Sequence, residues 1–286
     1  MASIKVRLAK KTGFCFGVKR AVEMAEAALK VKGPIFSLGS IIHNKQVVKA
    51  LALKGLKVVN NEADVTGGAC IISSHGISPV TAKRIVKRGV KLIDTTCPFV
   101  LKAQRIAKSL SDKAYNVIIV GDVLHPEVRA LVDFVATRSF VVKDGRSAER
   151  LKLDKKSRYI VIAQTTQSKS NFAHAVRAIS KKRCAGLKVF NTVCRDAEER
   201  QAAALLLAGT VDAMFVVGGN NSANTKRLYE VSRRALKESY LIETEAGIKK
   251  SWLKGKASVG ITSGASTPEW IVNQVVAKIL KKGDVS

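Results

Sequence analysis

Three cysteines at equivalent positions of an internal repeat constrain the fold of this 286-residue chain more than any other feature. Each cysteine follows a short apolar run, precedes an amphipathic helical pattern, and is followed 24 residues later by a glycine. The three pairs are Cys15 and Gly39, Cys97 and Gly121, and Cys194 and Gly218. The identical spacings predict three similar units, which we place at residues 1–96, 97–193 and 194–286.

Polar residues follow the predicted strands of every unit. Four positions after each glycine stands a polar side chain, and these are His43, His125 and Ser222. A third apolar run in each unit also ends in polar residues. Alternating strands and helices build parallel sheets, and ligands bind at the carboxyl ends of such strands. We therefore expect an α/β fold of three similar units with parallel sheets, arranged as a pseudo-threefold trefoil around a central cavity.

The cysteine pattern favours a metal site over disulfide bonds. The five cysteines are an odd number and include no C-x-x-C pair, which argues against a disulfide framework, a zinc ribbon and a thioredoxin motif. One thiolate in each unit suits either zinc or an iron–sulfur cluster. Zinc would need a fourth ligand such as His43, His75 or His125. A cubane cluster with three cysteines would leave one iron open to substrate. Cys70 lies in an apolar run and is expected in the core.

Glycine, hydroxyl and amide residues gather before two predicted helices, at residues 218–224 and 262–266. Free N–H groups at such helix N-termini bind anions, so a phosphate or diphosphate fits there. Neither segment matches a Walker A or dinucleotide fingerprint, so neither ATP nor NAD is implied. The loop histidines His43, His75 and His125 could bind such an anion as cations or relay protons.

Glu127 has two possible roles that its spacing does not separate. It follows His125 and a proline at a predicted helix start, where a carboxylate interacts favourably with the helix dipole. It could instead deliver protons to a substrate in the cavity.

The net charge of +28 favours acidic partners, since 50 lysines and arginines outnumber 22 aspartates and glutamates. A phosphorylated substrate, an acidic redox protein and a nucleic acid all qualify. The cations are spread along the chain and few aromatic residues are available for base stacking, so nucleic acid is the least favoured. No signal peptide is evident, and no run approaches the roughly 20 apolar residues of a membrane span. We therefore expect a cytoplasmic protein without membrane contact.

Nine short motifs follow one another along nearly the whole chain. They are Gly13-Phe14-Cys15-Phe16-Gly17-Val18, His43-Asn44, Ser74-His75-Gly76, Asp94-Thr95-Thr96-Cys97-Pro98, His125-Pro126-Glu127-Val128, Gln164-Thr165-Thr166, Asn191-Thr192-Val193-Cys194, Asn221-Ser222-Ala223-Asn224 and Gly264-Ala265-Ser266. Together, and in this order, they resemble the 4-hydroxy-3-methylbut-2-enyl diphosphate reductases, the last enzymes of the methylerythritol phosphate route to isoprenoids.

The resemblance implies a [4Fe–4S] cluster ligated by Cys15, Cys97 and Cys194. Glu127 would supply protons, helped by Thr165, which would also contact the substrate. The reaction would remove a hydroxyl group reductively, using two electrons and two protons, and yield isopentenyl and dimethylallyl diphosphate plus water. An acidic electron donor such as ferredoxin or flavodoxin would dock on the basic surface. The residues that the resemblance implies around the diphosphate are His43, His75, His125, Ser222, Ala223, Asn224 and Ser266.

Two departures from the family pattern stand close to these residues. Ala223 replaces a serine that the family usually has, and Arg195 and Asp196 place charges beside the third cysteine. Three alternatives stay open at this point: a zinc-dependent enzyme or scaffold on the same cysteines, a basic nucleic-acid-binding protein, and a related cluster reductase for another small phosphorylated alcohol.

Overall fold

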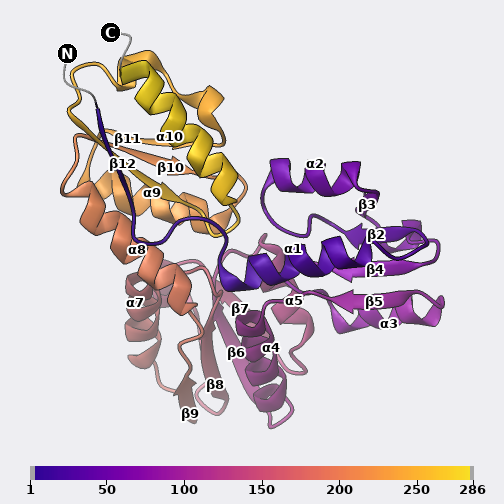
Figure 1. The fold of residues 1–286 in the computed structure, drawn as a ribbon. Coiled ribbons are helices and arrows are strands. Elements are labelled where there is room, and N and C mark those ends of the chain that lie inside the picture. Colours follow the sequence, from indigo (N-terminus) through magenta and orange to yellow (C-terminus); the bar gives the residue numbers. More distant parts are fainter. Residues whose placement is uncertain (1–3, 284–286) are drawn as a thin grey trace. The chain divides into compact units, whose positions relative to one another are not determined.

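A computed structural model describes residues 4–283 of the chain. Within these residues, twelve strands form three four-stranded parallel sheets (Figure 1). The first sheet has the order β1-β12-β10-β11, the second β3-β2-β4-β5, and the third β7-β6-β8-β9. The strands are β1 (Lys5–Leu8), β2 (Ile35–Leu38), β3 (Leu56–Val59), β4 (Ala69–Ile72), β5 (Lys91–Asp94), β6 (Tyr115–Val120), β7 (Ser139–Val142), β8 (Arg158–Ala163), β9 (Gly186–Val189), β10 (Ala213–Val217), β11 (Ser239–Ile242) and β12 (Ser258–Ser263).

Helices connect the strands, as parallel crossovers require. They are α1 (Phe16–Ala28), α2 (Lys45–Leu53), α3 (Pro79–Lys87), α4 (Pro98–Ser111), α5 (Pro126–Asp133), α6 (Gly145–Arg150), α7 (Lys169–Ser180), α8 (Arg195–Ala208), α9 (Ala223–Ala235) and α10 (Glu269–Gly283), with short 3₁₀ turns η1 (Glu62–Asp64), η2 (Glu245–Gly247) and η3 (Lys250–Trp252). No helix among the described residues is both long enough and apolar enough to cross a membrane.

Two compact units make up the described chain. The terminal unit combines the chain up to Lys19, His43–Val47 and the chain from Arg195 onward, and it holds the first sheet. The central unit combines Arg20–Ile42 and Val48–Cys194, and it holds the other two sheets.

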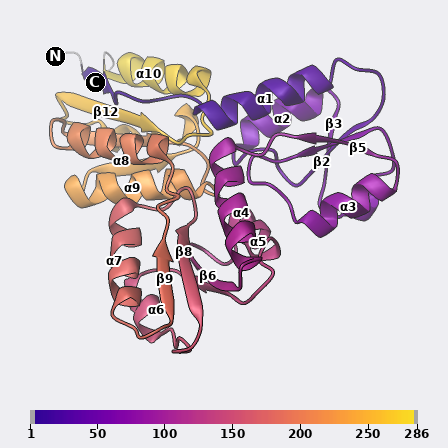
Figure 2. The same ribbon diagram turned by 90° about the horizontal axis from the view of Figure 1, so that it is seen from below.

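Helices cover both faces of the third sheet, so its inner strands read as unbroken apolar runs. Ile118 and Val120 on β6 pack against α6 and α7, through residues such as Phe172. The alternate residues Val117 and Ile119 pack against α4 and α5 (Figure 2). The two-residue period of a strand thus sends neighbouring side chains into two separate cores.

The first sheet is built in the same way within the terminal unit. Phe215 and Val217 on β10 pack against α10, whereas Val216 packs against α8 and α9. Figure 2 shows this sheet with α10 on one side and the α8–α9 pair on the other.

The expected α/β fold of three similar parallel-sheet units is confirmed, with two additions. The sequence analysis missed one edge strand in each sheet, namely β3, β7 and β11, which are short runs of four residues. The first strand was expected in the unit over residues 1–96, whereas β1 pairs with β12 and completes the first sheet. A four-residue strand carries no sign of its partner, because pairing depends on contacts far away in the chain. The boundaries at residues 96 and 193 stay a prediction.

Candidate active site

The backbone N–H groups of the three repeated cysteines make the same hydrogen bond. Each donates to a carbonyl just beyond the end of a third strand: Cys15 to Ala265 at 3.0 Å, Cys97 to Ser74 at 3.0 Å, and Cys194 to Thr165 at 2.8 Å. The acceptors follow β12, β4 and β8, respectively. The repeat therefore fixes each cysteine to the carboxyl-terminal edge of a sheet, where parallel sheets bind ligands.

The thiol environment fits a thiolate that holds a metal. Cys97 is the N-cap of α4, and Cys15 and Cys194 immediately precede α1 and α8, so each lies at the positive end of a helix dipole. The Sγ of Cys15 accepts a hydrogen bond from the N–H of Val18 at 3.4 Å. All three cysteines are outside disulfides and only partly buried. Cys70, in contrast, is fully buried in the core beside Phe36, as expected.

Glu127 and Thr165 form a buried pair in the central unit. The N–H of Thr165 donates to Oε1 of Glu127 at 2.6 Å, and the Thr165 hydroxyl donates to Oε2 at 2.8 Å. The Glu127 side chain is only 1% exposed, and its residue lies in the first turn of α5. The same Thr165 holds Cys194 through its carbonyl, so one residue connects the carboxyl group with a cysteine.

Burial raises the pKa of Glu127 to about 7, and the two hydrogen bonds from Thr165 oppose that rise. The desolvation penalty on the charged form is therefore the larger effect. A carboxyl group with this pKa holds a proton at neutral pH much of the time, as a general acid must. A carboxylate that only stabilised a helix dipole would gain nothing from such burial.

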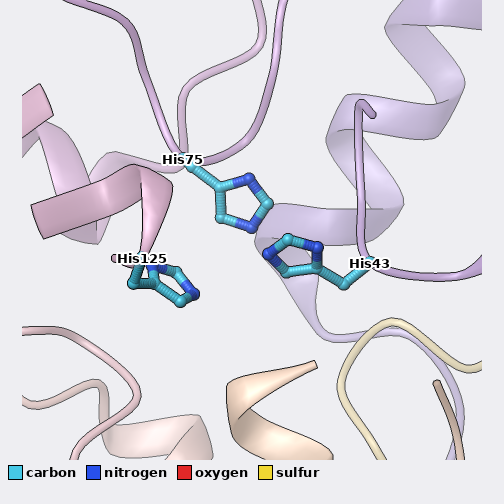
Figure 3. A group of neighbouring side chains, drawn as sticks. All are labelled: His43, His75 and His125. Carbon is cyan, nitrogen blue, oxygen red and sulfur yellow. The ribbon is translucent and has the colours of Figure 1, made fainter. Parts of the chain in front are cut away.

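His75 and His125 lie together in the central unit, with ring centroids 5.5 Å apart in an edge-to-face arrangement (Figure 3). His125 is the N-cap of α5, and its Nδ1 accepts a hydrogen bond from the N–H of Glu127 at 3.2 Å. This bond places the proton of a neutral His125 ring on Nε2. The N–H of His75 donates to the Ser73 hydroxyl at 3.3 Å.

Polar side chains of the terminal unit gather around the start of α9. Ser222 is the N-cap of this helix, and its Oγ accepts a hydrogen bond from Thr225 at 3.3 Å. Asn224 is buried, yet neither its Oδ1 nor its Nδ2 has a hydrogen-bond partner. Buried amides without partners are rare in folded proteins, because each missing bond leaves a desolvation cost. Asn224 therefore indicates a polar ligand at this helix start.

His43 and Ser266 are joined in the same unit. The Ser266 hydroxyl donates to the backbone carbonyl of His43 at 3.0 Å. Burial lowers the pKa of His43, and the positive charge of Lys226 on α9 lowers it further. The sequence analysis offered His43 as a cation for phosphate, whereas these two effects favour the neutral ring in the absence of an anion.

Two glycines, Gly218 after β10 and Gly264 after β12, allow their loops to approach α9 closely. A Cβ on Gly264 would lie 2.1 Å from Oγ1 of Thr225, and one on Gly218 would lie 2.7 Å from the same atom. Gly218 also has a φ of +154°, which favours glycine. The glycines therefore serve packing as well as the turns.

The charges beside the third cysteine are paired. Arg195 contacts Glu199 at 2.8 Å, and Asp196 contacts the buried Arg200 at 2.7 Å. Lys11 bonds to Glu199 and lies 3.6 Å from Asp196. Sequence analysis did not single out Arg200; the only signal was its i,i+4 spacing from Asp196.

Comparison with known proteins agrees with this arrangement over almost the entire chain. A family model described as LytB protein matches residues 6–280. A 4-hydroxy-3-methylbut-2-enyl diphosphate reductase of Geobacter metallireducens is 43% identical over 276 residues, which cover 96% of this chain and 97% of the relative. The reductase of the same name from Geobacter sulfurreducens is 44% identical, with the same coverage of both chains.

Two solved structures share the fold. The E-1-hydroxy-2-methyl-but-2-enyl-4-diphosphate reductase from Plasmodium falciparum has a TM-score of 0.90 and 29% identity, and the match covers 97% of this chain and 88% of that one. A second structure is described as (E)-4-hydroxy-3-methyl-but-2-enyl diphosphate reductase, the terminal enzyme of the non-mevalonate pathway. It has a TM-score of 0.70 and 36% identity, with 97% and 99% coverage. None of these relatives is named as a zinc enzyme or a nucleic-acid-binding protein.

Proposed function

Because this chain belongs to the LytB family of 4-hydroxy-3-methylbut-2-enyl diphosphate reductases, we propose that it removes the hydroxyl group of that diphosphate reductively. The substrate accepts two electrons and two protons, its C–O bond breaks, and one water leaves for each isopentenyl or dimethylallyl diphosphate formed. This is the terminal step of the non-mevalonate pathway, the step assigned to one of the solved relatives.

The family is one of iron–sulfur enzymes, and we assign a [4Fe–4S] cluster to Cys15, Cys97 and Cys194. The observation that carries this assignment is the shared backbone anchor of the three half-buried thiols. Thiolates are the usual ligands of such clusters, and a set of three leaves one iron for the substrate. When bound, the cluster would supply single electrons and Lewis acidity.

Glu127 would provide the proton for the departing hydroxyl group. Hydroxide is a poor leaving group, so protonation as the C–O bond breaks lowers the barrier. The pKa of about 7 leaves Glu127 roughly half protonated at neutral pH. Thr165 orients the carboxyl group through two hydrogen bonds and would pass the proton onward through its hydroxyl.

The diphosphate would be bound by the polar groups at the helix starts. Asn224 would donate its unpartnered amide to a phosphate oxygen, and the start of α9 would contribute its dipole. A bound dianion would reverse the effect of Lys226 and favour the protonated His43 ring. The full proposed set is His43, His75, His125, Thr165, Ser222, Ala223, Asn224 and Ser266.

The electrons would come from an acidic carrier such as ferredoxin or flavodoxin, in the cytoplasm. A charge of +28 would attract such a carrier and speed its encounter.

Anaerobic purification followed by a turnover assay tests the proposed function. The protein should be brown, contain about four irons per chain, and convert the hydroxylated diphosphate to the two products when methyl viologen is the reductant. A colourless zinc protein would reject the cluster. A brown protein that reduces another phosphorylated alcohol instead would reject the substrate but keep the cluster.

A further inference from the structure

We infer that a groove between β1 and α8 in the terminal unit is the docking surface for an acidic one-electron donor protein. The inference rests on the proposed function, and it locates the partner of that reaction on the molecule. The groove has a volume of about 610 Å³, and its walls are mainly apolar. The wall from β1 and the loop after it includes Leu8 and Ala9, and the wall from α8 includes Ala203, Leu206 and Leu207.

The apolar residues of α8 lie on two sides of the helix. Ala204 and Ala208 are buried against the first sheet, whereas Leu205 and Leu206 face solvent. Leu206 is 74% exposed, and Leu8 across the groove is 49% exposed. One exposed leucine is ordinary, but two on opposite walls of a single apolar groove indicate a binding surface.

The positive charges around the groove favour a negatively charged partner protein. Exposed Arg7 and Lys10 flank it, while Lys11 and Glu199 largely neutralise each other. A second copy of this chain would bring another +28 charges to the same surface and be repelled. An acidic protein with an apolar contact patch matches both the leucines and the cations.

Both walls of the groove lead directly to proposed cluster ligands. Lys11 lies four residues before Cys15, so their Cα atoms are within about 15 Å along the chain. The other wall, α8, begins at the residue after Cys194. A donor seated here would therefore approach the ends of two of the three ligand-bearing segments. Each encounter would oxidise one donor and transfer one electron, so two donors are consumed for every diphosphate reduced.

The test compares electron entry from a protein donor with electron entry from a small one. Leu206→Glu places a negative charge on the α8 wall of the groove, and Leu53→Glu, at a residue 82% exposed at the end of α2, is the matched control. The probe is a reduced acidic plant-type ferredoxin, and stopped-flow absorbance reports the rate of cluster reduction. Turnover with reduced methyl viologen is measured in parallel.

We expect Leu206→Glu to lower the second-order rate with ferredoxin at least tenfold, and to leave viologen-driven turnover within twofold of the wild type. Leu53→Glu should change neither rate. The charge-reversing Lys10→Glu should also slow ferredoxin, whereas the exposed Lys30→Glu, with the same change in net charge, should have a much smaller effect.

An unchanged ferredoxin rate in Leu206→Glu would overturn the docking surface, and so would equal losses with both reductants. A wild-type dimer in sedimentation that Leu206→Glu dissociates would show that a second copy occupies the groove, and would overturn the inference too. A wild-type protein that is inactive with viologen would instead contradict the proposed function, so the two failures are distinguishable.

Discussion

At the scale of single residues, Glu127 combines burial with two hydrogen bonds that keep its carboxyl group aimed in one direction. Burial alone would raise the pKa of the carboxyl group further, and hydrogen bonds alone would lower the pKa and keep the group ionised. The balance gives the pKa of about 7, close to the pH at which a general acid works best. Neither effect can be read from the letters around Glu127, which is why its two possible roles could not be separated from the sequence.

Glu127→Gln should lower kcat by at least about 100-fold, because the amide cannot donate a proton to the leaving group. The iron content and the visible spectrum should stay unchanged, since the carboxyl group contacts Thr165 rather than a cysteine side chain. In the wild type, kcat should fall as the pH rises through about 7. A wild-type profile that is flat from pH 6 to 9, or normal turnover in the variant, would exclude this acid.

The same substitution should stabilise the protein at alkaline pH. Below the ordinary pKa of 4.5, Glu127 is protonated in both the folded and the unfolded chain. Between 4.5 and about 7 only the unfolded chain loses its proton, so the folded state loses stability as the pH rises, and the loss is complete above about 7. This loss amounts to roughly 3 kcal/mol at most. Glu127→Gln should therefore exceed the wild type in Tm at pH 8 and match it near pH 4, and a lower Tm at pH 8 would contradict the assigned pKa.

Ala223 occupies the first position of α9, between two proposed diphosphate ligands. Ala223→Ser would add a hydroxyl group there, and one hydrogen bond to a charged phosphate is worth about 1 kcal/mol or more. KM should fall about fivefold with kcat unchanged, whereas the exposed Ala235→Ser at the other end of the helix should leave KM unaltered. An unchanged KM in Ala223→Ser would place this position outside the diphosphate site.

At the scale of elements, the strand–cysteine–helix segment is the feature that the sequence predicted best. A helix directly follows each of the three cysteines, as the repeat predicted, and the start of α4 at Pro98 is also marked by a local signal, its proline. The ion pair of Asp196 with the buried Arg200 was not predictable, since an arginine in a polar helical stretch normally faces solvent. In the sequence, Asp196 is a charge beside the third cysteine, and in the structure this charge is paired with Arg200 and Lys11.

The close approach of the loop after β12 to α9 can be tested at Gly264. Gly264→Ala would place a Cβ 2.1 Å from Oγ1 of Thr225, and overpacking of this kind costs about 1–3 kcal/mol. The cost should shrink in a Thr225→Ala background, which removes the clashing atom. Gly186→Ala is a control, because its Cβ would meet nothing nearer than 3.5 Å. Chemical denaturation measures the stability of the wild type, the three single variants and the double variant, and an equal cost of Gly264→Ala in both backgrounds would contradict the contact.

At the scale of the whole molecule, the repeat predicted three parallel sheets but not how the chain closes them. The glycine spacing located β2, β6 and β10, whereas the edge strands β3, β7 and β11 are not marked by the cysteines and glycines that define the repeat. The pairing of β1 with β12 joins residues about 250 positions apart, and no local pattern encodes such a partner. The candidate ligands followed from the repeat and the family motifs, whereas the burial of Glu127 and the unpartnered amide of Asn224 depend on the tertiary fold.

Mössbauer spectroscopy of the ⁵⁷Fe-loaded protein tests the central claim most directly, because it distinguishes irons by their ligands. Three cysteines on one [4Fe–4S] cluster predict three similar irons and one distinct iron, with only the distinct iron changing when the hydroxylated diphosphate is added. Four equivalent irons, a two-iron centre, or a spectrum that the diphosphate leaves unaltered would contradict the claim.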